Sequence, residues 1–336
     1  MEKLIVVITT YNLEKYISQA IDSVLMQKTN FKFKILIGDD ASVDNTQNIL
    51  KSYKEKYPEI IDLKLSEKNM GSLCNSNRLF DGLQCEYFTF LDGDDFWEDE
   101  NRLQKQIDFM DSHPDYMMCA GNTQYIRNGV QAEYLLKANE LGKTYTFEDY
   151  IASRMPFFHV SSILLRNKIY INGIPNCYKQ AEKTFENCAL RGEDFRRINH
   201  LEFGPLYAMP DLFSYYRIHD EGMWSGSSDL KRLIESTIQN NFLRKYFLKT
   251  NYFNYFNINF SNSYSLLMKY LIIKKNIGSS YNLSKKDTFL LTSLFNDLAE
   301  QNISFTPLQE IKYISNKSII SLMKRVCRKI KSMFKF

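Results

Sequence analysis

The chain has 336 residues, of which 44% are hydrophobic and 24% charged, and its net charge is +4. These fractions are typical of a globular protein with a sizeable core, and they exclude a disordered or collagen-like chain. The mean hydropathy is −0.37, and no apolar run is long enough to suggest a membrane span. The first residues turn polar too quickly for a signal peptide, so we expect a cytoplasmic protein.

Strands and helices are expected to alternate over the first 112 residues. The continuous β-branched run KLIVVIT (3–9) is typical of a buried parallel strand. The expected strands are 3–9, 33–37, 61–65 and 87–91; the expected helices are 13–26, 45–57, 72–83 and one from the N-cap Asp99 to about 112. This alternation predicts an α/β fold whose mostly parallel sheet is flanked by helices.

The remainder of the chain has a different character. Residues 115–225 are more irregular, with short strands expected at 116–120, 160–165 and 212–218. From about 230 onward Leu, Ile, Phe, Tyr, Asn and Lys predominate, which predicts a helical C-terminal region. We therefore expect an α/β domain over 1–225 and a helical region over 226–336.

Polar clusters follow three of the predicted strands. They are Thr9–Asn12 after the first strand, Asp39–Asp40 after the second and Asp92–Asp95 after 87–91. In open α/β sheets ligands bind beyond the carboxyl ends of the strands. The three clusters therefore predict one ligand site at that edge of the sheet.

The Asp92-Gly93-Asp94 pattern alone fits a solvated turn as well as a functional motif. Its context favours function, because three carboxylates at a strand end repel one another unless a cation compensates them. Mg²⁺ and Mn²⁺ prefer oxygen ligands and leave room for phosphates, so a metal-bound diphosphate fits. The GxGxxG, GxxxxGK[ST] and GxSxG motifs are absent, which disfavours dehydrogenases, P-loop enzymes and serine hydrolases.

Five segments together resemble the motifs of family 2 glycosyltransferases. They are ITTYN (8–12), IGDDASVDNT (37–46), FLDGDD (90–95), RGED (191–194) and YYRIH (215–219), in that order. The second segment resembles the DDGSTDNT signature of the family. The resemblance covers about residues 1–225 and implies the GT-A nucleotide-diphosphosugar transferase fold and an inverting mechanism.

The resemblance implies a nucleotide pocket at the first two clusters. Thr9 and Tyr11 would line it, and Asp40 would accept a hydrogen bond from the base. A carboxylate can accept from the N3–H of uracil or thymine, which cytosine lacks, so UDP- or dTDP-sugars are favoured over CMP-sugars. Asp39 fits a nucleotide contact and a turn residue that caps the next helix equally well.

The segment NMGSLCNSNR matches the family pattern NxGxxxARNxG only in part. It keeps Asn69, a further candidate contact for the nucleotide sugar, together with Gly71 and Asn77. Ser76 stands where Arg is usual, and Leu79 follows where Gly is usual. These departures put in doubt the contacts that the family makes there.

The resemblance also implies a metal site. Asp92 would contact the ribose or a metal-bound water, and Asp94 would bind the metal, either Mn²⁺ or Mg²⁺. His219 would bind the metal or the diphosphate, although an isolated histidine is often structural. Arg217 beside it can bind a phosphate oxygen.

Glu193–Asp194 resembles the acidic pair whose aspartate is the family's catalytic base. An inverting transfer needs one carboxylate to take the proton of the acceptor hydroxyl, and Asp194 is the candidate. The alternative is an N-cap or an ion pair with Arg196 or Arg197. Trp97 and Trp224 fit a sugar platform and a core position equally well.

The segment 317–336 carries seven Lys or Arg and no Asp or Glu, so the rest of the chain is slightly acidic. Apolar residues recur there at helical spacing, which predicts a basic amphipathic helix on an anionic membrane surface. The alternative is a helix packed on the protein's own core. Because the basic charge is confined to this tail, a nucleic-acid partner is not expected.

Together these observations predict a metal-dependent transferase that moves a single sugar from a nucleotide sugar to a hydroxyl of an envelope glycan or glycolipid. We expect it at the inner face of the cell membrane. No QxxRW motif is present, which disfavours a processive synthase. The alternative from another class is a catalytically silent sugar-binding or scaffold protein on the same fold.

Overall fold

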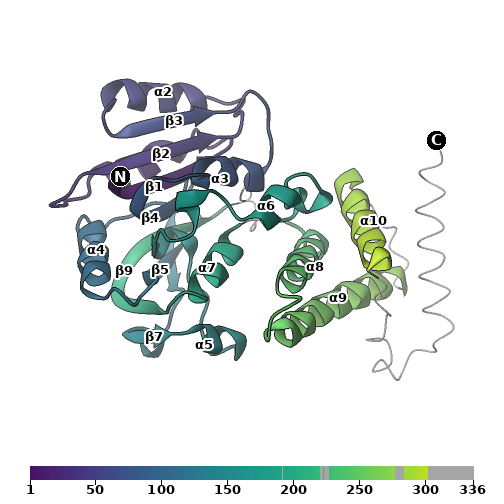
Figure 1. Ribbon diagram of the computed structural model, residues 1–336. Coiled ribbons are helices and arrows are strands. Elements are labelled where there is room, and N and C mark those ends of the chain that lie inside the picture. The colour runs from purple at the N-terminus through teal and green to yellow at the C-terminus, as the bar shows by residue number, and fades with distance from the viewer. Residues whose placement is uncertain (191, 220–221, 223–226, 277–283, 302–336) are drawn as a thin grey trace. The chain divides into compact units, whose positions relative to one another are not determined.

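The computed structural model describes residues 1–190, 192–219, 222, 227–276 and 284–301 (Figure 1). Contacts within the chain divide it into two units, Met1–Gly226 and Ser227–Phe336. The tail predicted over 317–336 lies outside the described residues, as do Trp224 and Arg191. The membrane-surface helix therefore stays a prediction, and so does the assignment of catalysis to residues 1–225.

Nine strands among the described residues form one sheet in the order β3-β2-β1-β4-β8-β5-β9-β7, with β6 paired to β5. Four successive strands make up its parallel part: β1 (Glu2–Thr10), β2 (Phe33–Asp39), β3 (Ile61–Leu65) and β4 (Cys85–Asp92). Five consecutive residues of β1, Leu4–Ile8, are buried. Both faces of this part are covered, as the unbroken apolar run predicts.

The other part of the sheet mixes both directions. Its strands are β5 (Met118–Arg127), β6 (Val130–Tyr134), β7 (Lys143–Tyr145), β8 (Ile163–Arg166) and β9 (Leu206–Ile218). β9 runs parallel to β5, whereas β8 is antiparallel to β4 and β5. β9 begins at Leu206, before the predicted residue 212. Pro210 breaks the sequence pattern of a strand, and the register with β5 shifts there, so the early part of β9 was not predicted.

Helices cover both faces of the parallel strands (Figure 1). α1 (Ile17–Leu25), α2 (Thr46–Lys56) and α4 (Arg102–Ser112) share one core cluster with alternate residues of β1 such as Val6. α3 (Ser72–Phe80) and α7 (Glu193–Leu201) pack on the opposite face. There the rings of Phe80 and His200 lie 5.3 and 5.8 Å from that of Phe88.

Short elements occupy the stretch between β6 and α7. They are α5 (Phe147–Ile151), α6 (Asn176–Ala181) and the 3₁₀ turns η1 (Ala138–Glu140), η2 (Val160–Ser162), η3 (Tyr170–Asn172) and η4 (Phe185–Cys188). The α/β fold class and the helical C-terminal region are confirmed.

The first helix begins at Ile17, four residues after the predicted start at Leu13. The preceding loop is fixed to the loop after β2 instead. Asn12 adopts a φ of 54°, and its Oδ1 accepts the N–H of Val43 at 2.9 Å. The N–H of Leu13 donates to Oγ1 of Thr46 at 2.9 Å. The two loops therefore brace each other at the edge where ligands are expected.

The prediction that Asp99 caps the fourth helix is wrong by two residues. The helix begins at Arg102, and Asn101 stands at its N-cap position. Asp99 instead accepts the N–H of Asn101 at 2.9 Å through its side chain.

The second unit contains α8 (Asp229–Tyr246), α9 (Phe253–Asn276) and α10 (Lys285–Glu300). Serine side chains cap the first and last of these: Ser228 accepts from the N–H of Lys231, and Ser284 from that of Asp287. No helix in the described part of the chain combines the length and hydropathy needed to cross a membrane.

Candidate active site

The carboxyl ends of β1, β2 and β4 bring the first candidate residues together. Thr9 pairs in register with Gly38 of β2 and with Asp92 of β4. Tyr11 follows β1 and is 44% exposed. Thr9 and Tyr11 therefore lie at the edge predicted to bind the nucleotide.

Asp39 is completely buried, and its carboxylate binds the loop that follows β2. One oxygen accepts the N–H of Ser42 at 2.9 Å and the side-chain amide of Gln47 at 2.7 Å, and the other accepts the Ser42 hydroxyl. These contacts are those of a turn residue that holds the start of the next helix, one of the two alternatives that the sequence left open.

Asp40 is 4% exposed and holds the entry to α3. Its two oxygens accept the N–H groups of Met70 and Gly71 at 2.8 and 2.9 Å. Gly71 has a φ of 90°, which favours glycine. Asn69 precedes this turn and is exposed. Asp40 thus has a structural role beside any contact with a base.

The departures from the family pattern in α3 have local compensation. A Cβ on Gly38 would lie 2.7 Å from Cδ1 of Leu79, so Leu79 packs directly on the bare backbone of β2. Arg78 stands two residues after the position where Arg is usual. Its guanidinium donates to the main-chain oxygens of Asp39 and Lys64, each at 2.8 Å, and so connects the ends of β2 and β3.

The acidic turn Asp92–Asp95 follows β4 and passes close to β1. The N–H of Gly93 donates to the carbonyl of Thr9 at 3.1 Å, and a Cβ there would lie 2.9 Å from that oxygen. Only glycine allows this approach, since a side chain would collide with the backbone of β1. The N–H of Asp95 closes the turn on the carbonyl of Asp92 at 3.0 Å.

Asp95 anchors the acidic turn to the neighbouring segments. It is completely buried, and its two oxygens accept the Ser161 hydroxyl at 2.8 Å and the N–H of Arg217 at 3.1 Å. Burial, together with the charges of Asp94 and Asp92, raises the pKa of Asp95 well above its usual value. The turn is thereby fixed to both η2 and β9.

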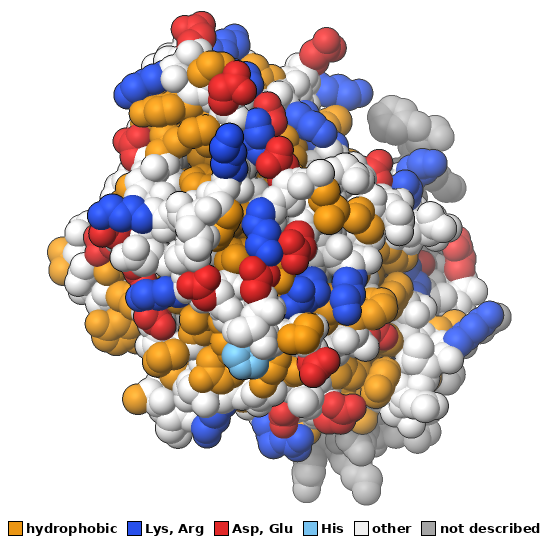
Figure 2. Space-filling model, turned by 60° about the vertical axis from the view of Figure 1, so that its left-hand side comes forward, with side chains coloured by type: hydrophobic (Ala, Val, Ile, Leu, Met, Phe, Trp, Pro, Cys, Tyr) orange, Lys and Arg blue, Asp and Glu red, His pale blue; other side chains and the backbone are white. Residues whose placement is uncertain are grey.

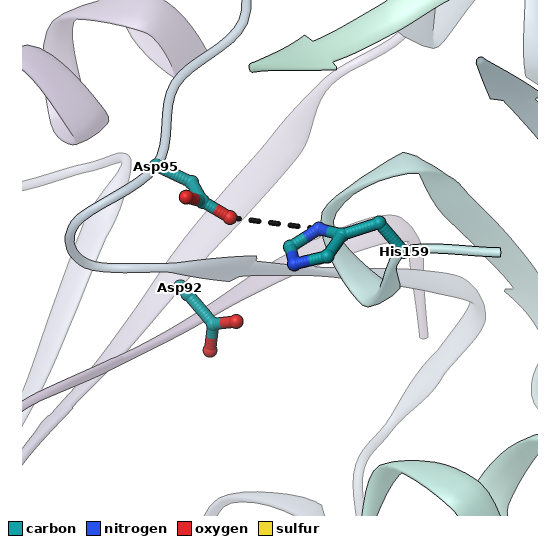
Figure 3. A group of neighbouring side chains, drawn as sticks. All are labelled: Asp92, Asp95 and His159. Atoms are coloured by element: carbon teal, nitrogen blue, oxygen red, sulfur yellow. Dashed lines mark ion pairs between the residues drawn. The ribbon is translucent and has the colours of Figure 1, made fainter. Parts of the chain in front are cut away.

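His159 lies beside this anchor, as Figure 3 shows. Its Nδ1 accepts the N–H of Ser161 at 3.3 Å and lies 3.5 Å from Oδ2 of Asp95. Burial lowers the pKa of His159 to about 4, against the opposing charge of Asp94. Both pKa shifts favour uncharged forms, so the Asp95–His159 contact is polar packing more than an ion pair.

Asp94 and His219 meet above the turn. Nε2 of His219 lies 3.1 Å from Oδ2 of Asp94, and the side chains are 14% and 21% exposed respectively. The guanidinium of Arg217 donates to the main-chain oxygen of Asp94 and to the side chain of Gln19. It also lies 4.4 Å from the ring centroid of Phe96. The end of β9 thus holds the acidic turn through both backbone and side chain.

Two sets of side chains could hold a divalent cation. One ligand atom from each of Asp92, Asp95 and His159 lies within 4.8 Å of the others. Asp95 is the weaker candidate, because both of its oxygens already accept hydrogen bonds in a fully buried position. Asp94 and His219 are joined by a hydrogen bond of 3.1 Å. Two neighbouring ligands of an octahedral ion would lie at a similar distance, about 3 Å, so an ion that replaced the shared proton could be held by this pair, with Asp92 in the same turn.

The acidic pair predicted to supply the base begins α7. Gly192 precedes it with a φ of 72°. Oδ1 of Asp194 accepts from Arg197 at 2.6 Å, and this carboxylate is 41% exposed. Arg197 also donates to the carbonyl of Phe158 at 3.4 Å. The ion pair that the sequence offered as an alternative is thus formed, and it connects Asp194 to the segment that carries His159.

Sequence reasoning gave no role to Asp95, His159 or Tyr216. Asp95 was visible as the third carboxylate of LDGDDFW, and Tyr216 as part of YYRIH. His159 stands in an irregular segment with no recognisable signal. Trp97 is 1% exposed, and its ring lies 3.6 Å from the guanidinium of Arg102, so it belongs to the core.

The face drawn in Figure 2 carries acidic and basic side chains interspersed among hydrophobic ones. On that face the coloured residues form no continuous field of one sign.

Comparison with known proteins identifies the family. The sequence model of glycosyl transferase family 2 matches residues 5–173, half of the chain. An uncharacterized protein of Mycobacterium tuberculosis is 27% identical over 232 residues, which are 69% of this chain and 63% of that protein. TuaG of Bacillus subtilis, named for teichuronic acid biosynthesis, is 33% identical over 44% of this chain and 56% of its own. The chain thus spans about three-fifths of the length of these relatives.

Two solved structures show the same fold. Residues 1–349 of TarS from S. aureus, in complex with UDP-GlcNAc, align with a TM-score of 0.50 and 17% identity over 80% of this chain and 81% of that one. The mannosyltransferase PcManGT of Pyrobaculum calidifontis, in complex with GDP-Man and Mn²⁺, aligns with a TM-score of 0.50 and 12% identity over 98% of this chain and 83% of its own. The predicted GT-A fold is confirmed.

Proposed function

The chain belongs to glycosyl transferase family 2, and from this premise we propose that it transfers a single sugar from a UDP- or dTDP-sugar to an acceptor hydroxyl, with inversion at the anomeric carbon. The observation that carries the proposal is the meeting of Asp94 and His219, 3.1 Å apart, at the ends of β4 and β9. Ligands of open α/β sheets bind at this edge.

The donor is assigned from the chemistry of Asp40. Each of its oxygens accepts one backbone N–H and keeps further acceptor capacity, so a base with an N3–H can be bound. Thr9 and Tyr11 stand at the same edge. The neighbour TarS supports this class of donor, since its structure contains UDP-GlcNAc.

Asp94 and His219 would hold the metal, with Asp92 beside them. A mixed oxygen and nitrogen pair favours Mn²⁺ over Mg²⁺, which takes oxygen ligands. The bound ion supplies Lewis-acid stabilisation of the diphosphate leaving group. Asp95 and Arg217 keep the acidic turn in place, because they fix its backbone to β9.

Asp194 is proposed as the base. As the acceptor oxygen bonds to the anomeric carbon, a carboxylate oxygen of Asp194 takes the hydroxyl proton. The bond from that carbon to the diphosphate breaks, and the nucleotide leaves with the electron pair. The ion pair with Arg197 occupies Oδ1 of Asp194, while the carboxylate as a whole is 41% exposed, so its other oxygen can accept the proton of an acceptor.

The acceptor is proposed to be an envelope glycan or a lipid-linked glycan. Support comes from TuaG, whose name refers to teichuronic acid biosynthesis. The predicted basic tail would keep the protein on the inner face of the cell membrane, next to a lipid-linked acceptor.

A thermal-shift panel tests the donor assignment. UDP-, dTDP-, GDP- and CMP-sugars are each added with Mn²⁺ and with EDTA. Stabilisation by a UDP- or dTDP-sugar that depends on Mn²⁺ is the expected result. A shift with CMP-sugars alone would contradict the role assigned to Asp40, because cytosine has no ring N–H to donate. A shift with GDP-sugars alone would contradict the assignment to uracil or thymine.

A further inference from the structure

Tyr216 stands near the end of β9 with its side chain on the face opposite to its neighbours. The rings of Tyr215 and Phe96 stack at 4.9 Å, and Arg217 lies over the same Phe96 ring. The ring of Tyr216 instead packs against His159 at 4.5 Å and against Tyr125 at 5.7 Å. Strand alternation therefore directs Tyr216 toward the segment that holds His159.

The hydroxyl of Tyr216 forms no hydrogen bond within the described part of the chain. Tyr215 differs in its surroundings, because Glu98 lies near its hydroxyl, and burial together with this carboxylate raises the pKa of Tyr215. Tyr216 is half-buried, and its hydroxyl is not among the enclosed unpaired atoms of the described residues, so it can be reached by a ligand. The two flanking rings fix the position of Tyr216, so the hydroxyl is held ready for a partner that the protein itself does not supply.

Carboxylates of the acidic turn and of α7 influence the Tyr216 hydroxyl. Burial raises the pKa of Tyr216, and so do the charges of Asp95, Asp94, Asp92 and Glu193. The phenol therefore remains protonated at neutral pH and can donate its proton to a ligand oxygen.

Contacts of the ring's neighbours lead to both parts of the site. His159, on which the ring packs, lies 3.5 Å from Asp95 of the acidic turn. The carbonyl of the adjacent Phe158 accepts from Arg197, the partner of Asp194. Tyr216 therefore stands beside the segment that connects the proposed metal site with the proposed base.

We infer that the Tyr216 hydroxyl donates a hydrogen bond to an oxygen of the sugar being transferred. This inference rests on the proposed function, because the sugar must occupy the space between the diphosphate and the base when the acceptor attacks. A donor fixed by two rings selects sugars with an oxygen at that place. Tyr216 is then a specificity-determining residue of the donor site.

The test compares Tyr216→Phe with the matched control Tyr215→Phe, which removes a hydroxyl on the other face of the same strand. The probes are UDP and four UDP-sugars: UDP-glucose, UDP-galactose, UDP-GlcNAc and UDP-GalNAc. Affinities are measured by isothermal titration calorimetry, and UDP release is followed with the sugar that the wild type binds best. Tm is measured for all three proteins.

For Tyr216→Phe we expect unchanged affinity for UDP and an affinity for the preferred UDP-sugar that is about 3- to 10-fold weaker, the effect of one hydrogen bond. Its Tm should match the wild type, since no bond within the protein is lost. Tyr215→Phe should bind UDP-sugar as the wild type does.

Equal UDP-sugar affinity in wild type and Tyr216→Phe would overturn the inference, as would an equal loss of UDP and UDP-sugar binding. A wild type that binds none of the UDP-sugars would instead contradict the proposed donor class.

Discussion

Nε2 of His219 lies 3.1 Å from Oδ2 of Asp94, although 125 positions separate the two residues in the chain. The contact exists because β9 ends beside the acidic turn. Phe96 and Tyr215 form an isolated antiparallel bridge there, and the N–H of Arg217 donates to Asp95. The end of β9 thus places His219 beside the carboxylates that follow β4.

Asp94→Ala is expected to abolish metal-dependent transfer. The substitution removes one of the two side chains that fit a cation, and it leaves the buried anchor Asp95 in place. The Tm should stay close to that of the wild type, because Asp94 is partly exposed and its removal lessens repulsion within the turn. UDP release with increasing Mn²⁺ measures the loss.

The matched control is Asp211→Ala. Asp211 belongs to β9 and pairs with Lys105 at 2.7 Å, away from the acidic turn. It should release UDP at the wild-type rate. Full activity of Asp94→Ala with the same Mn²⁺ dependence would remove Asp94 from the metal site.

Asp194→Asn should keep donor binding and lower turnover by on the order of 10²–10⁴, the typical contribution of a general base. The amide cannot take the proton of the acceptor hydroxyl. Steady-state kinetics, with donor affinity measured separately, distinguish this from a binding defect.

Asp229→Asn provides the control for the lost ion pair. Asp229 pairs with Arg232 at 2.8 Å, three residues on, at the start of α8, as Asp194 pairs with Arg197 at the start of α7. This variant should keep its turnover. If Asp194→Asn lost donor affinity and kept its turnover, the residue would have a binding or structural role.

Asp40→Ala should weaken UDP binding and also destabilise the fold. The substitution leaves the N–H groups of Met70 and Gly71 without their acceptor, and each unpaired buried donor costs about 1–3 kcal/mol. Asp40→Asn keeps one acceptor oxygen and should lose less stability. UDP affinity at wild-type level in a folded Asp40→Ala would count against base recognition, whereas an unchanged Tm would count against the structural role.

Stability should fall on mild acidification, in part through His200. Burial lowers the pKa of His200 to about 4 from its ordinary value of 6.5. Between these values the unfolded chain binds a proton that the native protein does not. The free energy of unfolding therefore decreases as pH falls through this window, by roughly 3 kcal/mol at most.

The variant His200→Gln tests this assignment, since the amide does not titrate. Urea unfolding at pH 7 and pH 5 should show a smaller acid-induced loss of stability for the variant than for the wild type. Parallel losses in both proteins would show that His200 is not responsible.

Much of the fold was predictable because local patterns are strong in the first 112 residues. The continuous apolar run of β1 and the alternation that follows it specify a covered parallel sheet. The early part of β9 was not predictable from local pattern, since Pro210 interrupts the strand where its register shifts. The start of α1 was missed because contacts with residues about 30 positions away, such as that between Asn12 and Val43, decide where the loop ends.

The sequence predicted the position of a candidate site residue only where that residue directly follows a predicted strand. The sequence placed Asp92 and Asp94 at a strand end, but the partners of Asp95 lie 66 and 122 residues away. His159 comes from an irregular segment whose position depends on the packing of Tyr216 and Ser161. No local pattern contains such contacts, and they became visible only in the folded chain.

The most direct test of the account measures UDP release from a UDP-sugar by the full chain, with an acceptor extract of lipid-linked glycans. The account predicts release that requires Mn²⁺ or Mg²⁺, increases when acceptor is added and stops in EDTA. In the same assay, Asp94→Ala is expected to release UDP only at the background rate. Binding of UDP-sugar by the wild type without UDP release under any of these conditions would contradict the account and identify a silent sugar-binding protein.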